Sequence, residues 1–308
     1  MSGDPRRHLH RTRHTGPPAR PAPYPETGNR HQGDDQMTMT QSVRTEGADI
    51  VYDYEGNGPL LLMISGGGGA AEHYARISGF LSGHYTVVRY DRRGNSRSTG
   101  DTTADLDMAQ QARDAAAVIG AMGGGKARVF GSSGGANIAL QLAADHPDVI
   151  VALVAHEGPT SPLLPDADAW LAFADRVYAT FTGEGAGAAS RMFASELVGF
   201  DGADPQQARV AAGELTTNAE FFMAREYLPL ATFSPDLDTI RRNKVPMVTA
   251  AGRQSAGAYY ARTARIQAER LGCPILEFPG NHLGFIFEAP GFATTLRGAL
   301  DDLTAGRT

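Results

Sequence analysis

The chain has 308 residues, of which 42% are hydrophobic and 20% charged, as in an ordinary soluble globular protein. Its formal charge of −6 and pI near 5.8 argue against a nucleic-acid-binding protein, which would present a basic face. A single cysteine, Cys273, excludes an internal disulfide and any two-cysteine metal or redox motif. Such cysteine usage fits a reducing cytoplasm, with a disulfide-free secreted protein as the alternative. No apolar run approaches the roughly 18–20 residues that cross a bilayer, so we expect no membrane span.

The first 36 residues differ in composition from the rest of the chain. They contain six prolines, four histidines and six arginines, with almost no aliphatic side chains. Such a segment cannot bury enough apolar surface to offset the conformational entropy lost on ordering. It also lacks the apolar stretch of about 7–15 residues that marks a secretory signal peptide. We therefore predict a disordered leader over residues 1–36, with the folded protein beginning near Met37.

From about residue 43, segments with strand patterns alternate with segments of helical periodicity. Two alternating segments that each end in glycine predict a β-hairpin, and later continuous apolar runs predict strands buried on both faces. The predicted strands lie within 42–47, 49–56, 59–65, 85–90, 127–131, 148–158, 245–252 and 274–280. The predicted helices are 72–81, 103–122, 134–144, 259–271 and one from Pro290. This alternation predicts an α/β fold with a mainly parallel, eight-stranded sheet and helices on both faces.

One long stretch departs from the alternation. Residues 159–240 show helical periodicity and no convincing strand, which predicts a helical lid inserted into a core formed by residues 37–158 and 241–308. Such a lid would cover the C-terminal edge of the sheet, where α/β sheets bind ligands. It is rich in aromatic residues, and we expect a few, Trp170 and Phe222 among them, to line an apolar pocket for a hydrophobic acyl or aromatic substrate.

The segment Gly-Ser-Ser-Gly-Gly at residues 131–135 matches the pattern G-x-S-x-G, with Ser133 at its centre. It lies between a predicted strand and a predicted helix. A sharp turn at that point forces the central residue into a strained conformation, which requires small neighbours. Its hydroxyl would then project above the sheet. A plain tight turn is the alternative, but the strand-to-helix context favours Ser133 as a nucleophile.

A nucleophilic serine needs a base and a site for the oxyanion. A serine at its ordinary pKa must have a base within hydrogen-bond reach. His282 lies in a loop after the last predicted strand, at the same edge of the sheet, although a locally bonded loop histidine is the alternative. The run Ile-Ser-Gly-Gly-Gly-Gly-Ala-Ala offers backbone amides free of side chains, so we expect the amides of Gly67 and Gly134 to bind the oxyanion.

The same glycine run supports a second interpretation. Gly66, Gly68 and Ala71 fit G-x-G-x-x-A, and Asp91 follows 25 residues after Gly66, as in a dinucleotide-binding fingerprint. Such fingerprints normally follow the first strand of a sheet, whereas a hairpin precedes this one. No Tyr-x-x-x-Lys pair accompanies it. An NAD(P)-dependent oxidoreductase is therefore a remote alternative.

Four motifs together resemble those of the α/β-hydrolase superfamily over residues 43–303. They are the sequences SGGGG, YDRRGNSRS, GSSGG and GNH. The resemblance implies the α/β-hydrolase fold and the activities of esterases, lactonases, thioesterases and related enzymes. It also implies that residues 91–98 brace the sheet edge and the glycine loop. Fold alone does not identify the substrate.

The chain departs from the superfamily at two positions. Ser65 stands where the family often has histidine before the oxyanion glycine. The acid that orients the base usually follows the seventh strand, where this chain has Ser255 and no nearby Asp or Glu. The best substitute is Glu157, which ends the sixth predicted strand, as in haloalkane dehalogenases. The alternative is that Glu157 merely caps the start of the lid.

The residues together predict a cofactor-independent serine hydrolase. Ser133 would attack an ester, lactone, thioester or related acyl bond of a small apolar substrate, with His282 as base and Glu157 orienting it. Ser65, Ser132 and Ser255 are further candidates for the substrate pocket. A non-hydrolytic member of the superfamily, such as a lyase, isomerase or small-ligand binder, is the alternative. We expect no metal and a monomer or homodimer.

Overall fold

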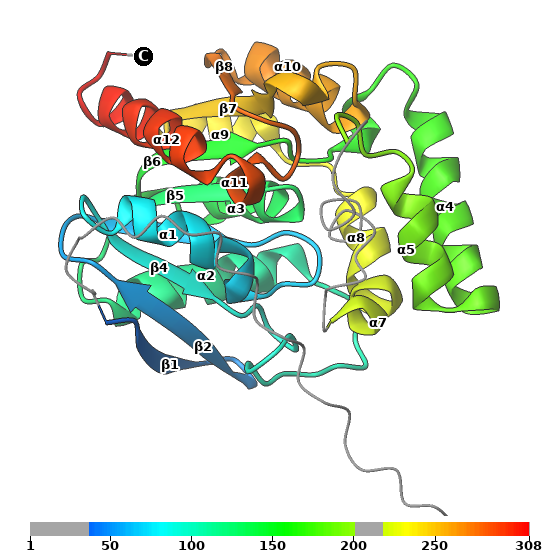
Figure 1. Cartoon of the computed structure of the whole chain (residues 1–308), viewed down its shortest axis with the longest axis horizontal. Helices are drawn as coiled ribbons and strands as arrows, with labels where there is room; N and C mark the ends of the chain where they lie inside the picture. The colour runs from blue at the N-terminus through cyan, green and yellow to red at the C-terminus, as the bar shows by residue number, and fades with distance from the viewer. Residues whose placement is uncertain (1–36, 201–217, 308) are drawn as a thin grey trace, which may run out of the picture. The chain divides into compact units, whose positions relative to one another are not determined.

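The computed structural model describes residues 37–200 and 218–307; the predicted leader, residues 1–36, lies outside them. The described chain forms one eight-stranded sheet (Figure 1). Its strands are β1 (Met39–Thr45), β2 (Ala48–Glu55), β3 (Leu60–Ile64), β4 (Thr86–Tyr90), β5 (Ala127–Ser132), β6 (Ile150–His156), β7 (Met247–Gly252) and β8 (Ile275–Phe278). They lie in the order β1-β2-β4-β3-β5-β6-β7-β8; β2 pairs antiparallel with β1 and β4, and all other neighbouring strands pair in parallel. The predicted fold, with its opening hairpin, is confirmed.

Helices cover both faces of the sheet. One face carries α2 (Met108–Ala121), α3 (Gly134–Asp145), α9 (Leu237–Asn243) and α10 (Tyr259–Leu271), whose apolar side chains enter one core cluster. The other face carries α1 (Ala75–Leu81), α11 (Gly284–Phe287) and α12 (Ala289–Thr304), which form a second cluster (Figure 1). Four short helices lie in the connections between these elements: η1 (Ala71–Tyr74), η2 (Pro147–Val149), η3 (Ser161–Leu163) and η5 (Arg253–Ser255).

Helix α2 begins later than the sequence predicts. The expected start was Thr103, but the helix begins at Met108 because Asp107 caps it. The Asp107 carboxylate accepts hydrogen bonds from the backbone N–H groups of Ala109 and Gln110. Side-chain acceptors at this position satisfy amides that have no partner inside the helix. The capping side chain therefore fixes the boundary more sharply than periodicity does.

A helical insert separates β6 from β7. It contains α4 (Ala167–Glu184), α5 (Ala186–Ala194), α7 (Ala219–Phe221), the π-helix η4 (Phe222–Glu226) and α8 (Tyr227–Ala231). In Figure 1, α4 and α5 pack side by side at one end of the sheet. The described parts of this insert contain helices and no strand, and residues 201–217 of the predicted lid lie outside the described residues. Across the described chain, no helix is both long and apolar enough to span a membrane.

Candidate active site

Ser133 occupies a strained turn between β5 and α3. Its backbone angles are φ 58° and ψ −131°, a region that residues other than glycine rarely adopt. The backbones around it approach so closely that a Cβ on Gly131 would lie 2.3 Å from the Gly135 carbonyl oxygen. A Cβ on Gly135 would lie 1.9 Å from the carbonyl oxygen of Ile64. The glycines of the motif are therefore required by the packing that produces this conformation.

Glu157 and His282 meet although 125 residues separate them in the chain. Glu157 follows β6 and has a positive φ of 49°, while His282 lies in the loop after β8. The Glu157 Oε2 atom lies 2.6 Å from His282 Nδ1. The second carboxylate oxygen, Oε1, accepts the backbone N–H of Gly252 at 2.7 Å. The Glu157 side chain is fully buried and that of His282 is 7% exposed, so the structure seals this pair from solvent.

The charge state of Glu157 determines which nitrogen of His282 carries the proton. Burial raises the pKa of Glu157, but interactions with His156 and hydrogen bonds from His282 and the Gly252 N–H outweigh it, so the pKa lies below its usual value. An ionised carboxylate can only accept hydrogen bonds, which requires a proton on His282 Nδ1. The other ring nitrogen, Nε2, is then left as a proton acceptor.

His156, the last residue of β6, packs beside this pair as a neutral residue. Its side chain is completely buried, and Nδ1 lies 2.9 Å from Ser132 Oγ. Burial lowers the pKa of His156 to about 4. The ring of Tyr260 also covers His282, with 4.4 Å between the ring centroids. These two rings form apolar walls that limit the orientations available to the His282 ring.

The predicted oxyanion loop, residues 65–69 after β3, lies against the serine turn. A Cβ on Gly66 would lie 2.9 Å from the Cβ of Ser133, so these two backbones are in contact. A Cβ on Gly67 would lie 2.8 Å from the ring of Phe222 in η4. The amide of Gly134 is the first of α3, where the helix dipole favours negative charge. The loop thus lies between the turn and the insert.

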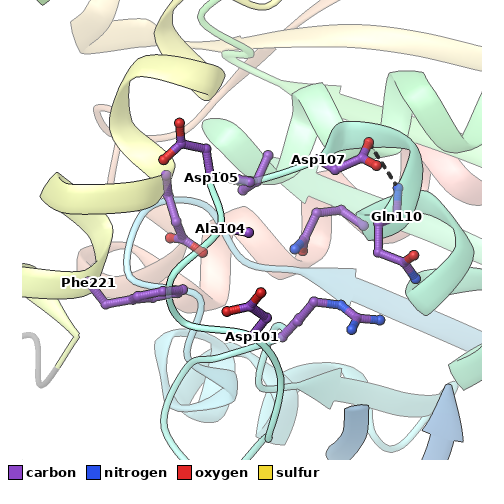
Figure 2. Close-up of a pocket in the computed structure, with 10 residues that line it drawn as sticks. Asp101, Ala104, Asp105, Asp107, Gln110 and Phe221 are labelled. Atoms are coloured by element: carbon purple, nitrogen blue, oxygen red, sulfur yellow. Dashed lines mark hydrogen bonds between the residues drawn. The ribbon is translucent and has the colours of Figure 1, made fainter. Parts of the chain in front are cut away.

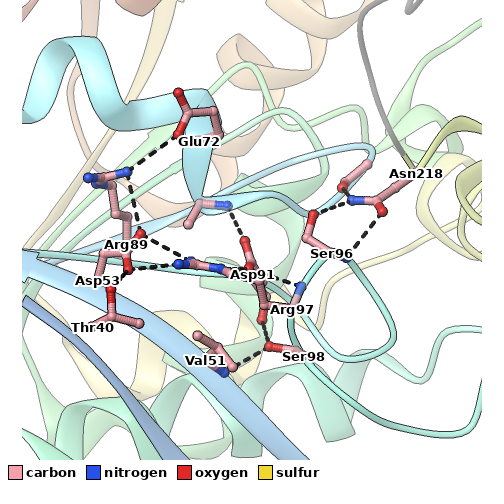
Figure 3. A network of polar contacts seen from close by, with 12 residues as sticks. Thr40, Val51, Asp53, Glu72, Arg89, Asp91, Ser96, Arg97, Ser98 and Asn218 are labelled. Atoms are coloured by element: carbon pink, nitrogen blue, oxygen red, sulfur yellow. Dashed lines mark hydrogen bonds and ion pairs between the residues drawn. The ribbon is translucent and has the colours of Figure 1, made fainter. Parts of the chain in front are cut away.

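The loop at residues 91–98 holds the glycine loop through a polar network (Figure 3). The Asp91 carboxylate accepts the Ala71 N–H at 2.7 Å and the Arg97 guanidinium at 2.5 Å. Arg97 also donates two hydrogen bonds to Asp53 of β2, at 2.9 and 3.0 Å. These contacts engage the Asp91 carboxylate inside the protein, whereas a dinucleotide-binding site would need it for ribose hydroxyls.

The two predicted aromatic pocket residues have different surroundings. Phe222 packs on the oxyanion loop and makes edge contacts with Phe193 and Tyr227, with ring centroids 6.2 and 5.9 Å away. Trp170 instead stacks on Tyr259 of α10 with centroids 4.3 Å apart. Phe222 is therefore the aromatic residue that the structure brings to the glycine loop, while Trp170 ties α4 to the core.

The three predicted pocket serines are buried. Ser132 is bonded to His156, as described above. The Oγ atoms of Ser65 and Ser255 are buried without a hydrogen-bond partner among the described residues. Unpaired buried hydroxyls are uncommon, because each loses its bonds to water. A role for these two hydroxyls in the substrate pocket stays a prediction.

Asp166 and Asp236 serve local structure. Asp166 pairs with Arg262 of α10 and accepts the Trp170 indole N–H at 3.1 Å. Asp236 caps α9 by accepting the Thr239 N–H at 2.9 Å. Among Glu157, Asp166 and Asp236, the structure brings only the carboxylate of Glu157 to His282.

A separate cavity of about 190 Å³ lies between residues 101–107 and the insert (Figure 2). Its lining includes the acidic residues Asp101, Asp105 and Asp107, with Phe221 and Glu226 on the side of the insert. The Asp107 carboxylate is already used as the α2 cap. No group of three or more His, Cys, Asp or Glu side chains among the described residues is arranged to hold a metal ion.

Two buried charged residues, Arg92 and Glu226, were not among the site residues predicted from the sequence, although Arg92 lies in the segment 91–98 expected to brace the glycine loop. They form an ion pair of 2.7 Å with side-chain exposures of 0% and 1%. The available signal was the charged dipeptide Arg225-Glu226 inside the otherwise apolar, aromatic run at residues 221–230 of the insert. Charged side chains are almost never fully buried unless paired, so a charge on an apolar helix indicates a buried partner. The sequence does not reveal which partner.

Residues 59–217 match the α/β hydrolase fold family, and the chain belongs to this family. The Bacillus subtilis (strain 168) protein named "Uncharacterized hydrolase YraK" is 29% identical over 273 residues, covering 86% of this chain and 97% of that protein. A thermophilic esterase from Thermogutta terrifontis matches with a TM-score of 0.72 and 17% identity, covering 86% of this chain and 99% of the esterase. The enol-lactonase from Burkholderia xenovorans LB400 matches with a TM-score of 0.68 and 20% identity, covering 85% of this chain and 100% of the lactonase. These structural likenesses show the fold.

Proposed function

We propose that the protein is a cofactor-independent serine hydrolase that cleaves an ester, lactone, thioester or related acyl bond of a small apolar substrate. Ser133 is the nucleophile, His282 the general base and acid, and Glu157 the group that orients His282. The amides of Gly67 and Gly134 bind the oxyanion. The single free cysteine further supports a cytoplasmic location.

The reaction proceeds in two acyl-transfer steps. Ser133 Oγ attacks the substrate carbonyl carbon while His282 Nε2 takes the hydroxyl proton, and the negative charge forms on the carbonyl oxygen. The intermediate collapses to an acyl-serine as His282 gives its proton to the departing alcohol or thiol. Water then attacks the acyl-serine with His282 again as base, which releases the carboxylic acid and restores Ser133.

The buried contact between Glu157 and His282 carries the proposal. A carboxylate at 2.6 Å from Nδ1 leaves Nε2 unprotonated, which is the state that a general base needs. It also stabilises the imidazolium that forms after proton transfer. The strained Ser133 supports the same function, because such strain concentrates at functional sites. The aromatic side chains of the insert and the names of the esterase and lactonase relatives support the substrate class.

Labelling with a fluorophosphonate probe tests the proposal. The probe should modify the wild-type protein at Ser133, identified by peptide mass spectrometry, and Ser133→Ala should not be labelled. Ser132→Ala is the matched control, because it removes the adjacent hydroxyl and should still be labelled at Ser133. Absence of label on Ser133 in the wild type would refute covalent serine catalysis and favour a non-hydrolytic member of the family.

A further inference from the structure

A buried ion pair connects the insert to the loop after β4. Glu226, the last residue of the π-helix η4, accepts hydrogen bonds from Arg92 Nη1 and Nη2, both at 2.7 Å. Asn95 Nδ2 donates a third bond to the same carboxylate at 2.8 Å. Burying two charges is costly, and one bidentate pair with an added donor compensates for that cost. Because both side chains are buried, the pair does not contribute to the solubility of the protein surface.

Arg92 uses its remaining N–H groups to hold the oxyanion loop. Nε donates to the carbonyl oxygen of Ser65 at 3.1 Å, and Nη2 donates to that of Gly66 at 2.8 Å. In a planar trans peptide, the C=O of one residue and the N–H of the next point in opposite directions. Fixing the Gly66 carbonyl toward Arg92 therefore directs the Gly67 N–H away from Arg92. Gly66 itself lies in contact with Ser133.

The same part of the insert touches the loop at two further points. Asn218 Nδ2 donates to the carbonyl oxygen of Gly68 at 2.6 Å and also bonds Ser96 (Figure 3). The ring of Phe222 covers Gly67. Asn218, Phe222 and Glu226 are spaced four residues apart, so they lie on one side of consecutive helical turns. One side of the insert thus contacts the oxyanion loop or the arginine that holds it.

A neighbouring ion pair shows what a purely structural pair looks like here. Arg93 donates to Asp114 of α2 at 2.9 and 2.8 Å, and the Asp114 side chain is fully buried. The other Arg93 contacts go to Thr45 and the Glu46 carbonyl in the β1–β2 turn. This pair has similar chemistry and burial but bonds to the hairpin rather than to the oxyanion loop.

We propose that Arg92 and Glu226 are positioning residues, which act through the peptide between Gly66 and Gly67. Arg92 orients that peptide so that the Gly67 N–H serves the oxyanion, and Glu226 fixes and neutralises Arg92 from the insert. The inference rests on the proposed function and deepens it, because the insert then controls the catalytic geometry as well as covering the substrate. Neither side chain touches the reacting atoms.

Three variants distinguish a role in positioning the Gly66–Gly67 peptide from a role in the stability of the fold. Glu226→Gln should lower kcat roughly 10- to 100-fold with KM changed less than about threefold, because a misdirected oxyanion donor affects the transition state most. Its melting temperature should fall by about 5–10 °C, since Arg92 is left without a counter-charge. The control Asp114→Asn should lower the melting temperature by a similar amount, while its kcat stays within about twofold of wild type. In each variant, the rate constant for fluorophosphonate labelling should change by about the same factor as kcat.

The double variant Arg92→Met/Glu226→Met keeps the experiment decisive if Glu226→Gln folds poorly. Apolar side chains of similar volume remove both buried charges, so its melting temperature should rise above that of Glu226→Gln, although the Ser65 carbonyl loses its donor. Its kcat should remain as low as that of Glu226→Gln. Recovery of kcat together with stability, or equal kcat losses in Glu226→Gln and Asp114→Asn, would overturn the inference. Absence of label on wild-type Ser133 would instead overturn the proposed function, and the inference with it.

Discussion

Replacing Glu157 with glutamine tests the centre of the proposed mechanism with a nearly isosteric change. The carboxylate makes two hydrogen bonds, one with His282 and one with the Gly252 N–H. The glutamine amide has one oxygen and one nitrogen. Because the Gly252 N–H requires an acceptor, the amide oxygen must take the Gly252 side, which turns the NH₂ group toward His282 Nδ1.

That orientation reverses the protonation of the base. An NH₂ group donates to Nδ1, which favours the tautomer with the proton on Nε2, and this tautomer cannot accept the proton of Ser133. The corresponding change in serine proteases lowers kcat about 10⁴-fold. Glu157 is fully buried, so water cannot replace the lost charge, and we expect a loss of about 10³–10⁴ in kcat.

The assay is steady-state hydrolysis of a short-chain aryl ester by Glu157→Gln and by the control Asp166→Asn. Asp166 lies in the insert, where it makes an exposed ion pair with Arg262 that contributes little to stability. Asp166→Asn should keep kcat within about twofold of wild type. A Glu157→Gln protein that folds and retains more than about a tenth of wild-type kcat would refute the assignment of the orienting acid.

Three further changes have defined expected outcomes. Ser133→Ala should lower kcat by roughly 10³-fold or more with little change in melting temperature, and near-normal turnover would exclude covalent catalysis. Burial lowers the pKa of His156 from 6.5 to about 4, so the unfolded chain binds more protons in that window and stability should fall by about 2 kcal/mol from pH 7 to pH 5. Urea unfolding of His156→Phe should lack this part of the pH dependence, and an unchanged slope would contradict it. Gly135→Ala should lose about 3 kcal/mol or more, because its Cβ meets the Ile64 carbonyl, whereas Gly134→Ala should lose about 1 kcal/mol because only a flexible leucine side chain must move. Equal losses from the two alanine variants would contradict this packing argument.

Local pattern was enough to predict the layout of the fold. Apolar runs bounded by glycine predicted the strands, and 3.6-residue periodicity predicted helices such as α10 at the same residues that the structure shows. The G-x-S-x-G motif placed Ser133 in a strand-to-helix turn because steric limits on that turn act over five consecutive residues. These features depend on neighbours in sequence, so the sequence carries them directly.

The partners of the site residues depended on the tertiary structure. Glu157 remained one of two interpretations until the order β5-β6-β7-β8 brought the β6 end beside the loop that carries His282. The contact between Arg92 and Glu226 joins residues 134 apart, and no local pattern connects them. Periodicity reports which side of an element is buried, but only the packing of elements decides which buried charge meets which. The sequence alone therefore determined the elements, the serine turn and the position of the candidate base, while the packed chain decided which carboxylate contacts that base and which side chains contact the glycine loop.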